Sequence, residues 1–103
     1  MIPIKLNPTP ITEETFERQG WIKERDEDMR GNEYSYWYLP LPKNSKDPYG
    51  PCLVSNPDNQ QIKGISENEY CVEIMDFGGL GFCSSEEEIE VLYEMLTKQS
   101  INK

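Results

Sequence analysis

The chain has 103 residues, enough for one domain, and its 11% aromatic residues compensate for a hydrophobic content of only 36%. Its 19 acidic and 10 basic residues give a formal net charge of −9, and it has no histidine. A surface this acidic repels phosphate backbones, so we expect no direct binding to nucleic acid. Without histidine, a cysteine or serine nucleophile lacks its usual base, so we expect no enzyme.

The first residues and the cysteines predict the compartment. Residues 1–5 lack the apolar stretch of a secretory signal, and no apolar run approaches the ~18 residues of a membrane span. We therefore expect a cytoplasmic protein without membrane contact. The three cysteines have no CxxC spacing. This predicts free thiols, with a bridge between Cys71 and Cys83 as the alternative.

A short helix is predicted at residues 13–19. Thr12 can cap its free backbone N–H groups, and Gly20 supplies the left-handed residue that ends it. A helix of this length is marginal alone. We therefore expect it to dock on the rest of the fold through Phe16 and Trp21.

Two strands follow, at residues 21–25 and 33–39, with a turn signal at Gly31-Asn32 between them. The second strand carries aromatic side chains on both faces. That pattern fits a strand covered on both sides, and it equally fits a strand with one exposed aromatic face. One face has Tyr34, Tyr36 and Tyr38, and the other has Ser35, Trp37 and Leu39.

Further strands are predicted at residues 52–55 and 70–75, with a return strand at 60–65 between them. The glycine-rich turn Gly78–Gly81 comes next and matches neither dinucleotide nor phosphate-loop spacing. The acidic run at residues 86–88 would repel a phosphate bound there. We therefore interpret the turn as a structural corner.

The last helix is predicted to begin at about Ser85, which has the spacing of a capping box with Glu88; Ser84 with Glu87 is the alternative register. Apolar residues then recur at helical spacing and predict the stripe that covers the sheet. The stripe is Ile89, Leu92, Tyr93 and Leu96, and the water-facing side is Glu86, Glu87, Glu90 and Glu94.

The predicted fold is a single α+β domain over residues 1–103. An antiparallel sheet of about four or five strands is packed by a short N-terminal helix and a C-terminal amphipathic helix. Residues 1–10 form an extended lead-in, and residues 99–103 form a frayed tail. The acidic runs at residues 26–28 and 86–88 lack the spacing of a metal loop, so we expect neither metal nor cofactor.

Two segments carry a resemblance: Pro10–Glu14 with Gly20-Trp21, and Leu92–Thr97, roughly a quarter of the chain together. In them the chain resembles short uncharacterised proteins of phage and mobile-element genomes of Bacteroidetes-type bacteria. That group usually has a glycine followed by an aromatic residue, and later a Leu-Tyr-x-x-Leu-Thr segment. This chain has Lys98 where the group typically has glycine. The resemblance brings no activity and implies a small protein-binding modulator.

The leading prediction is therefore a small acidic protein-interaction module that binds a protein partner. The sequence does not predict its oligomeric state. One alternative is an acidic DNA mimic that inhibits a nucleic-acid enzyme. Another is a small-ligand binder or enzyme with a pocket beside Gly78–Gly81. The predicted interface comprises exposed aromatics or helix carboxylates: Tyr34, Tyr36, Trp37, Tyr38, Glu86, Glu87, Glu90 and Glu94.

Overall fold

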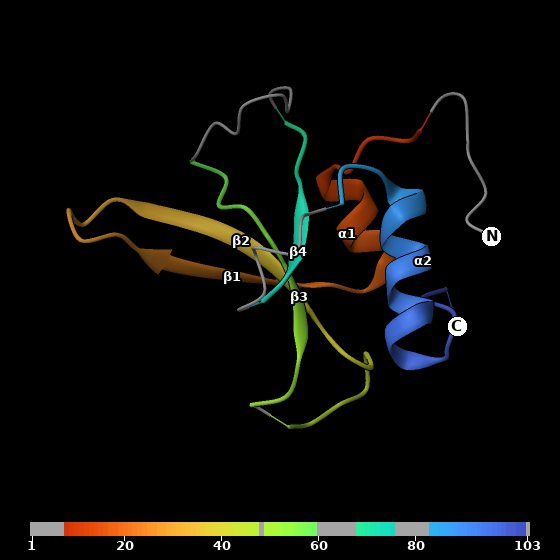
Figure 1. Cartoon of the computed structure of the whole chain (residues 1–103). Coiled ribbons are helices and arrows are strands. Elements are labelled where there is room, and N and C mark those ends of the chain that lie inside the picture. Colours follow the sequence, from red (N-terminus) through yellow and green to blue (C-terminus); the bar gives the residue numbers. More distant parts are fainter. Residues whose placement is uncertain (1–7, 48, 60–67, 76–82, 103) are drawn as a thin grey trace.

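The computed structural model describes residues 8–47, 49–59, 68–75 and 83–102, and shows two helices and a four-stranded antiparallel sheet (Figure 1). The sheet order β1-β2-β3-β4 follows the chain. The α+β prediction is confirmed with four strands; the predicted strand at 60–65 and the turn at 78–81 lie outside the described residues. The elements are α1 (Glu13–Gln19), β1 (Ile22–Glu27), β2 (Glu33–Pro40), β3 (Cys52–Ser55), β4 (Val72–Ile74) and α2 (Glu86–Thr97).

Both helices lie on one side of the sheet, and the β1–β2 hairpin projects away from them (Figure 1). The hairpin turns at Asp28–Asn32, where the Asp28 carboxylate accepts hydrogen bonds from the backbone N–H groups of Arg30 and Asn32. Gly31 adopts a left-handed conformation (φ 81°), which glycine tolerates without strain. This turn sets the register that pairs the two strands.

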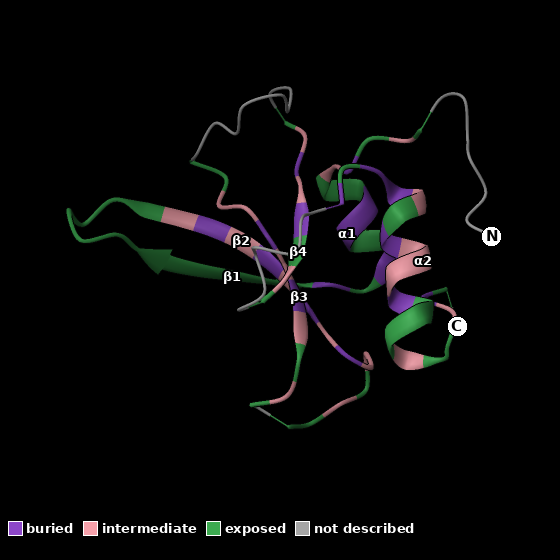
Figure 2. Cartoon of the chain, in the orientation of Figure 1, coloured by how far each residue is buried: buried purple, intermediate pink, exposed green. Residues whose placement is uncertain are grey.

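Strand β2 alternates between buried and half-buried residues along its length (Figure 2). Side chains of a strand point alternately to opposite faces, so one face of β2 enters the core and the other does not. Among the described residues the second face is half-buried, so it lies between the two interpretations: it is neither fully covered nor an exposed aromatic face. Ser35, Trp37 and Leu39 are buried, and Tyr34, Tyr36 and Tyr38 are half-buried.

Helix α1 docks on the sheet through an aromatic cluster centred on Phe16, which has no exposed surface. The Phe16 ring centroid lies 4.8 Å from that of Trp21, 5.3 Å from Trp37 and 5.2 Å from Tyr70. Such ring pairs add to the free energy gained by burying their area. The predicted ends of the helix, Thr12 and Gly20, are also confirmed.

Helix α2 is capped by Ser85, whose Oγ accepts a hydrogen bond from the backbone N–H of Glu88. Ile89 and Tyr93 are fully buried, as predicted, but Leu96 is 47% exposed, so its place in the sheet-covering stripe was wrong. The reason is that the chain reverses at Lys98 (φ 64°) and brings Ile101 into the core at this end of the helix.

Ile101 also changes the prediction for the C-terminus. Its side chain is only 1% exposed, so the predicted frayed tail at 99–103 is wrong at this position. The turn is supported by Thr97, whose hydroxyl donates to the Tyr93 carbonyl and accepts from the Gln99 N–H. The Tyr93 hydroxyl in turn accepts a hydrogen bond from the backbone N–H of Lys43.

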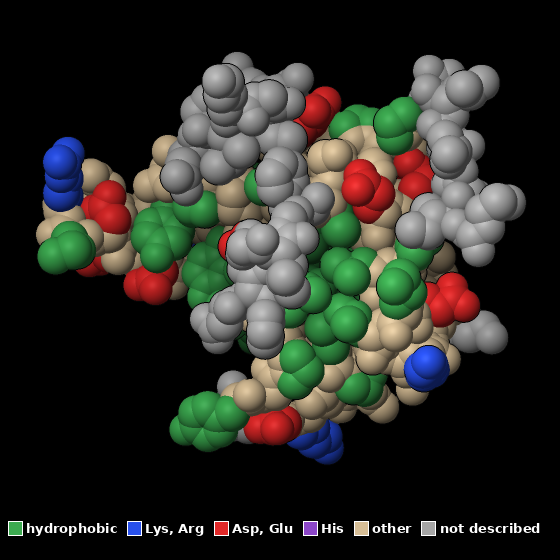
Figure 3. Space-filling view, viewed as in Figure 1, with side chains coloured by type: hydrophobic (Ala, Val, Ile, Leu, Met, Phe, Trp, Pro, Cys, Tyr) green, Lys and Arg blue, Asp and Glu red, His purple; other side chains and the backbone are tan. Residues whose placement is uncertain are grey.

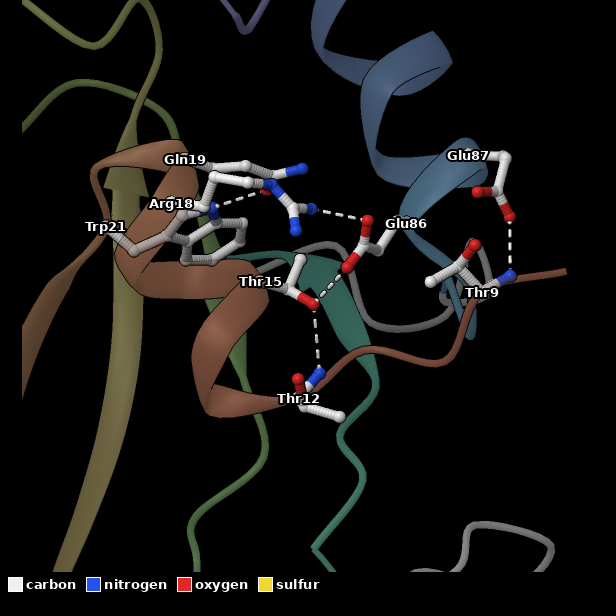
Figure 4. A network of polar contacts seen from close by, with 8 residues as sticks. All are labelled: Thr9, Thr12, Thr15, Arg18, Gln19, Trp21, Glu86 and Glu87. Carbon is white, nitrogen blue, oxygen red and sulfur yellow. Dashed lines mark hydrogen bonds and ion pairs between the residues drawn. The ribbon is translucent and has the colours of Figure 1, made fainter.

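Glu86, predicted to face water, is instead buried between the two helices (Figure 4). Its carboxylate accepts hydrogen bonds from the Arg18 guanidinium and from the Thr15 hydroxyl. These donors from α1 offset the cost of removing the carboxylate from water. The neighbouring Glu87 accepts a 2.7 Å hydrogen bond from the backbone N–H of Thr9, so the start of α2 anchors the chain that leads into α1.

Candidate functional site

The face of the sheet opposite the helices carries the tyrosines of β2, and we call it the tyrosine face. Residues paired across antiparallel strands point to the same side, so the pairing of the four strands defines its members. Glu24 lies opposite Tyr36, and Asp26 lies opposite Tyr34. The members are Ile22, Glu24, Asp26, Tyr34, Tyr36, Tyr38, Pro40, Cys52, Val54, Glu73 and Met75.

A hollow of about 440 Å³ opens on the tyrosine face. Its volume is within the range of sites that hold a small molecule or a few side chains of a partner. Two apolar side chains at its border are unusually open to solvent, Ile22 at 42% and Met75 at 41% exposed. The lining comes from Ile22, Glu24, Tyr36, Tyr38, Pro40, Cys52 and Met75, with Ser45–Asp47 and Gly50–Pro51 from the β2–β3 loop.

The charged residues of β1 are distributed unevenly between its two faces: Lys23, Arg25 and Glu27 share one face, and Glu24 and Asp26 share the other. Lys23 points to the helix side, where its Nζ lies 3.6 Å from a Glu13 carboxylate oxygen and 5.5 Å from the centroid of the Trp37 ring. Glu24 and Asp26, on the alternate positions, point to the tyrosine face. The alternation of acidic and basic residues in this strand therefore makes the tyrosine face acidic.

The other strands reinforce this charge. Glu73 of β4 adds a third carboxylate, and the described strand residues contribute no Lys or Arg to the face. Lys46, from the β2–β3 loop, reaches the hollow beside Asp47. In the view of Figure 3, hydrophobic side chains run along the hairpin toward the centre of the molecule, and Lys and Arg side chains lie at the periphery.

This environment shifts the pKa of the Tyr36 hydroxyl. Burial raises its pKa above the usual value, and the carboxylates of Glu24 and Asp26 raise it further, with smaller contributions from Tyr34 and Tyr38. The hydroxyl therefore stays protonated at physiological pH, able both to donate and to accept a hydrogen bond. This is the chemistry of a binding surface with polar tips on apolar side chains.

The three cysteines form no disulfide, as predicted, and the alternative bridge between Cys71 and Cys83 is absent. Burial, together with Glu88 and Cys71, raises the pKa of Cys83 to about 11. Burial also raises the pKa of Cys71. Both thiols thus lack the lowered pKa of a reactive cysteine. Cys52 borders the hollow, with its Sγ 3.5 Å from the Met75 Sδ.

The predicted interface residues do not form one surface. Three of the four aromatics gather on the tyrosine face, whereas Trp37 is buried in the core and stacks with Phe16. Helix α2, which carries the predicted carboxylates, lies on the other side of the sheet (Figure 1). There Glu86 is buried, Glu87 and Glu90 are half-buried, and Glu94 is exposed.

Several members of the tyrosine face were missed from the sequence. For Glu24 and Asp26 a signal existed, because the turn at Gly31-Asn32 fixes which β1 residues oppose the tyrosines. For Cys52 and Met75 no signal existed. Their meeting depends on the pairing of β3 with β4, which lie 16 residues apart in sequence at their nearest ends (Ser55 and Val72, with residues 56–71 between).

Comparison with family models, with curated proteins and with solved structures found no match to this chain. Within the described ranges, no helix is both long and apolar enough to cross a lipid bilayer. Among the same residues, no three Cys, Asp or Glu side chains come together as metal ligands would. The site is therefore interpreted from its own geometry and charge.

Proposed function

We propose that this protein is a small acidic protein-interaction module that binds a partner protein through the tyrosine face. The observation that carries the proposal is the hollow of about 440 Å³, lined by Tyr36 and Tyr38 and bordered by the exposed side chains of Ile22 and Met75. Tyrosine is enriched among the residues that dominate binding energy at protein interfaces, because it buries a large apolar area and keeps a polar tip.

The construction of the sheet supports this proposal. The buried core comes from the helices, from the helix-facing residues of β2, β3 and β4 and from the connecting segments, and it includes none of the three tyrosines of β2. Three half-buried tyrosines at alternate positions form an apolar surface with polar tips outside the core, and apolar surface patches often mark interaction sites. The proposal assigns the chain no catalytic activity and places it in the cytoplasm, where its three free thiols would stay reduced.

The test is affinity capture from the cells that express the protein, comparing the natural chain with two double variants. The tyrosine variant, Tyr36→Thr with Tyr38→Thr, removes the aromatic rings but keeps residues that favour strands. The control variant, Met95→Ala with Leu96→Ala, removes two exposed apolar side chains from α2. Circular dichroism and a thermal melt establish that each variant is folded.

The proposal expects a defined partner that the natural chain and the control variant capture equally, and that the tyrosine variant captures at least about tenfold less. Equal capture by all three proteins would contradict it. So would loss of capture with the control variant alone, because that result would place the binding surface on α2. A partner that is itself a nucleic-acid enzyme, bound through α2, would favour the DNA-mimic alternative.

A further inference from the structure

The tyrosine face combines aromatic rings with carboxylates in a repeating arrangement. This arrangement indicates which side chains a partner should carry. We propose, resting on the function proposed above, that the face binds an extended segment of a partner protein that carries Arg or Lys at alternate positions. The segment lies along β2, with its basic side chains over the tyrosine rings and toward the carboxylates of β1.

The spacing of the rings supports an extended segment. Tyr34, Tyr36 and Tyr38 occupy every second position of β2, and the ring centroids of Tyr34 and Tyr36 lie 6.2 Å apart. Side chains on one face of an extended peptide repeat every two residues, which is roughly 6.6 Å. Alternate side chains of such a peptide therefore meet successive tyrosines without any change of backbone shape.

The pairing of rings with carboxylates supports a basic segment. Glu24 lies opposite Tyr36 and Asp26 lies opposite Tyr34, so each of these rings has an acid beside it. A guanidinium or ammonium group over a tyrosine ring is attracted by the negative face of the ring. The adjacent carboxylate adds an ion pair to the same cation. Two such ring–acid pairs lie in line along the strands.

The separation of charge on β1 makes this arrangement selective. The bases of that strand point away, toward the helices, with Lys23 paired to Glu13. A basic segment therefore meets no Lys or Arg of the described strands on this face, and the loop residue Lys46 lies in the hollow beside Asp47; an acidic segment would meet Glu24, Asp26 and Glu73. Like charges set against each other in an interface disfavour the wrong partner.

The experiment is a selection of random heptapeptides displayed on phage against the natural chain, followed by measurement of the dissociation constant of the best free peptide. Two variants lose the same two negative charges. The face variant is Glu24→Gln with Asp26→Asn, and the matched control is Glu90→Gln with Glu94→Gln on α2. The tyrosine variant serves as the third protein. A version of the peptide with citrulline in place of arginine, or acetyl-lysine in place of lysine, removes the charge from the ligand.

The inference expects selected peptides enriched in Arg or Lys two positions apart. Their dissociation constant should rise roughly tenfold with the face variant and with the neutral peptide, and by less than about twofold with the control. Added salt should weaken the binding, because exposed charges are screened over about 10 Å at 0.1 M.

Three results would overturn the inference: no peptide above background, peptides without basic residues, or equal weakening by the control variant. The second result separates the two proposals. If peptides without basic residues still lose binding to the tyrosine variant, the tyrosine face is a binding site for a different chemistry. If the tyrosine variant binds as the natural chain does, the proposed function itself fails.

Discussion

Trp37 and Tyr36 are neighbours in β2, yet they belong to opposite regions of the molecule. Trp37 is 6% exposed and stacks with Phe16 beneath the helices. Tyr36 is half-buried on the other face, beside Glu24 and Asp26. One strand therefore has two unlike faces. Its buried face belongs to the core, and its half-buried face is the one that the proposed function assigns to a partner.

The two sets of carboxylates show the same division. Glu86 is surrounded by donors from α1 and joins the two helices. Glu24 and Asp26 face solvent on the tyrosine face. Glu86 therefore joins two elements of the fold through fixed donors, whereas Glu24 and Asp26 leave negative charge at the surface, which the further inference assigns to recognition. The predictions below test this division.

The largest effect is expected from Trp37→Ala, which removes a buried ring that stacks on Phe16 at the centre of the aromatic cluster. Such truncations cost about 3–5 kcal/mol of unfolding free energy. The matched change on the other face, Tyr36→Thr, should cost about 1 kcal/mol or less, because its ring already contacts water. Urea denaturation followed by tryptophan fluorescence and circular dichroism measures both. Equal losses would show that the tyrosine face belongs to the core.

Removing the buried carboxylate should come next. Glu86→Ala leaves the Thr15 hydroxyl and the Arg18 guanidinium without their acceptor, at a cost of about 2 kcal/mol. The Arg18 side chain is half exposed, which limits the loss. Glu94→Ala should change the unfolding free energy by less than about 0.5 kcal/mol. In a double-mutant cycle, Arg18→Ala should couple to Glu86 and not to Glu94; coupling to neither would contradict the account.

Alkaline pH should weaken the core. Cys83 and Tyr70 have pKa values raised to about 11 and about 12, each first because of burial. The unfolded chain loses these protons at lower pH, so their contribution is complete below about pH 9 and declines as pH rises through about 11 to 12. Melts at pH 7, 9 and 10.5 should show this decline. Cys83→Ala should make the decline of stability between pH 9 and 10.5 less steep. An unchanged decline would show that this thiol does not cause it.

The smallest effect concerns the end of α2. Lys98 is left-handed (φ 64°), a conformation that glycine adopts without strain, as Gly20 does at the end of α1 (φ 84°). Lys98→Gly should therefore raise the unfolding free energy by about 0.5–1 kcal/mol. Thermal melts would detect the gain. A loss of stability would mean that the lysine side chain holds the turn before Ile101.

Much of the fold was predictable because it is encoded locally. The ends of α1 and the start of α2 follow from Thr12, Gly20 and Ser85, and the faces of β2 follow from its alternation. Leu96 and Ile101 were mispredicted because helical periodicity does not say where the sheet ends. A reversal of the chain after Lys98 brings a residue from outside the helix into the core.

The site was predictable only in part, for a related reason. The alternation placed the three tyrosines on one face of β2 and Trp37 on the other, but it did not say which face enters the core. From the sequence, Glu86 is indistinguishable from the exposed acids of the helix. Only the packing of α1 beside α2 brings the Arg18 donor to it. The local sequence predicts which face of a strand or helix a residue occupies. It does not predict which groups of other elements the side chain contacts, because tertiary packing decides that.

The most direct test of the division between the two faces is the dissociation constant of the captured partner. It is measured for the natural chain and for the variant with Tyr36→Thr and Tyr38→Thr. The account predicts that the dissociation constant rises at least about tenfold. Over the same change, the free energy of unfolding should fall by no more than about 2 kcal/mol. An unchanged dissociation constant would contradict it, because the tyrosines would then be neither core nor interface.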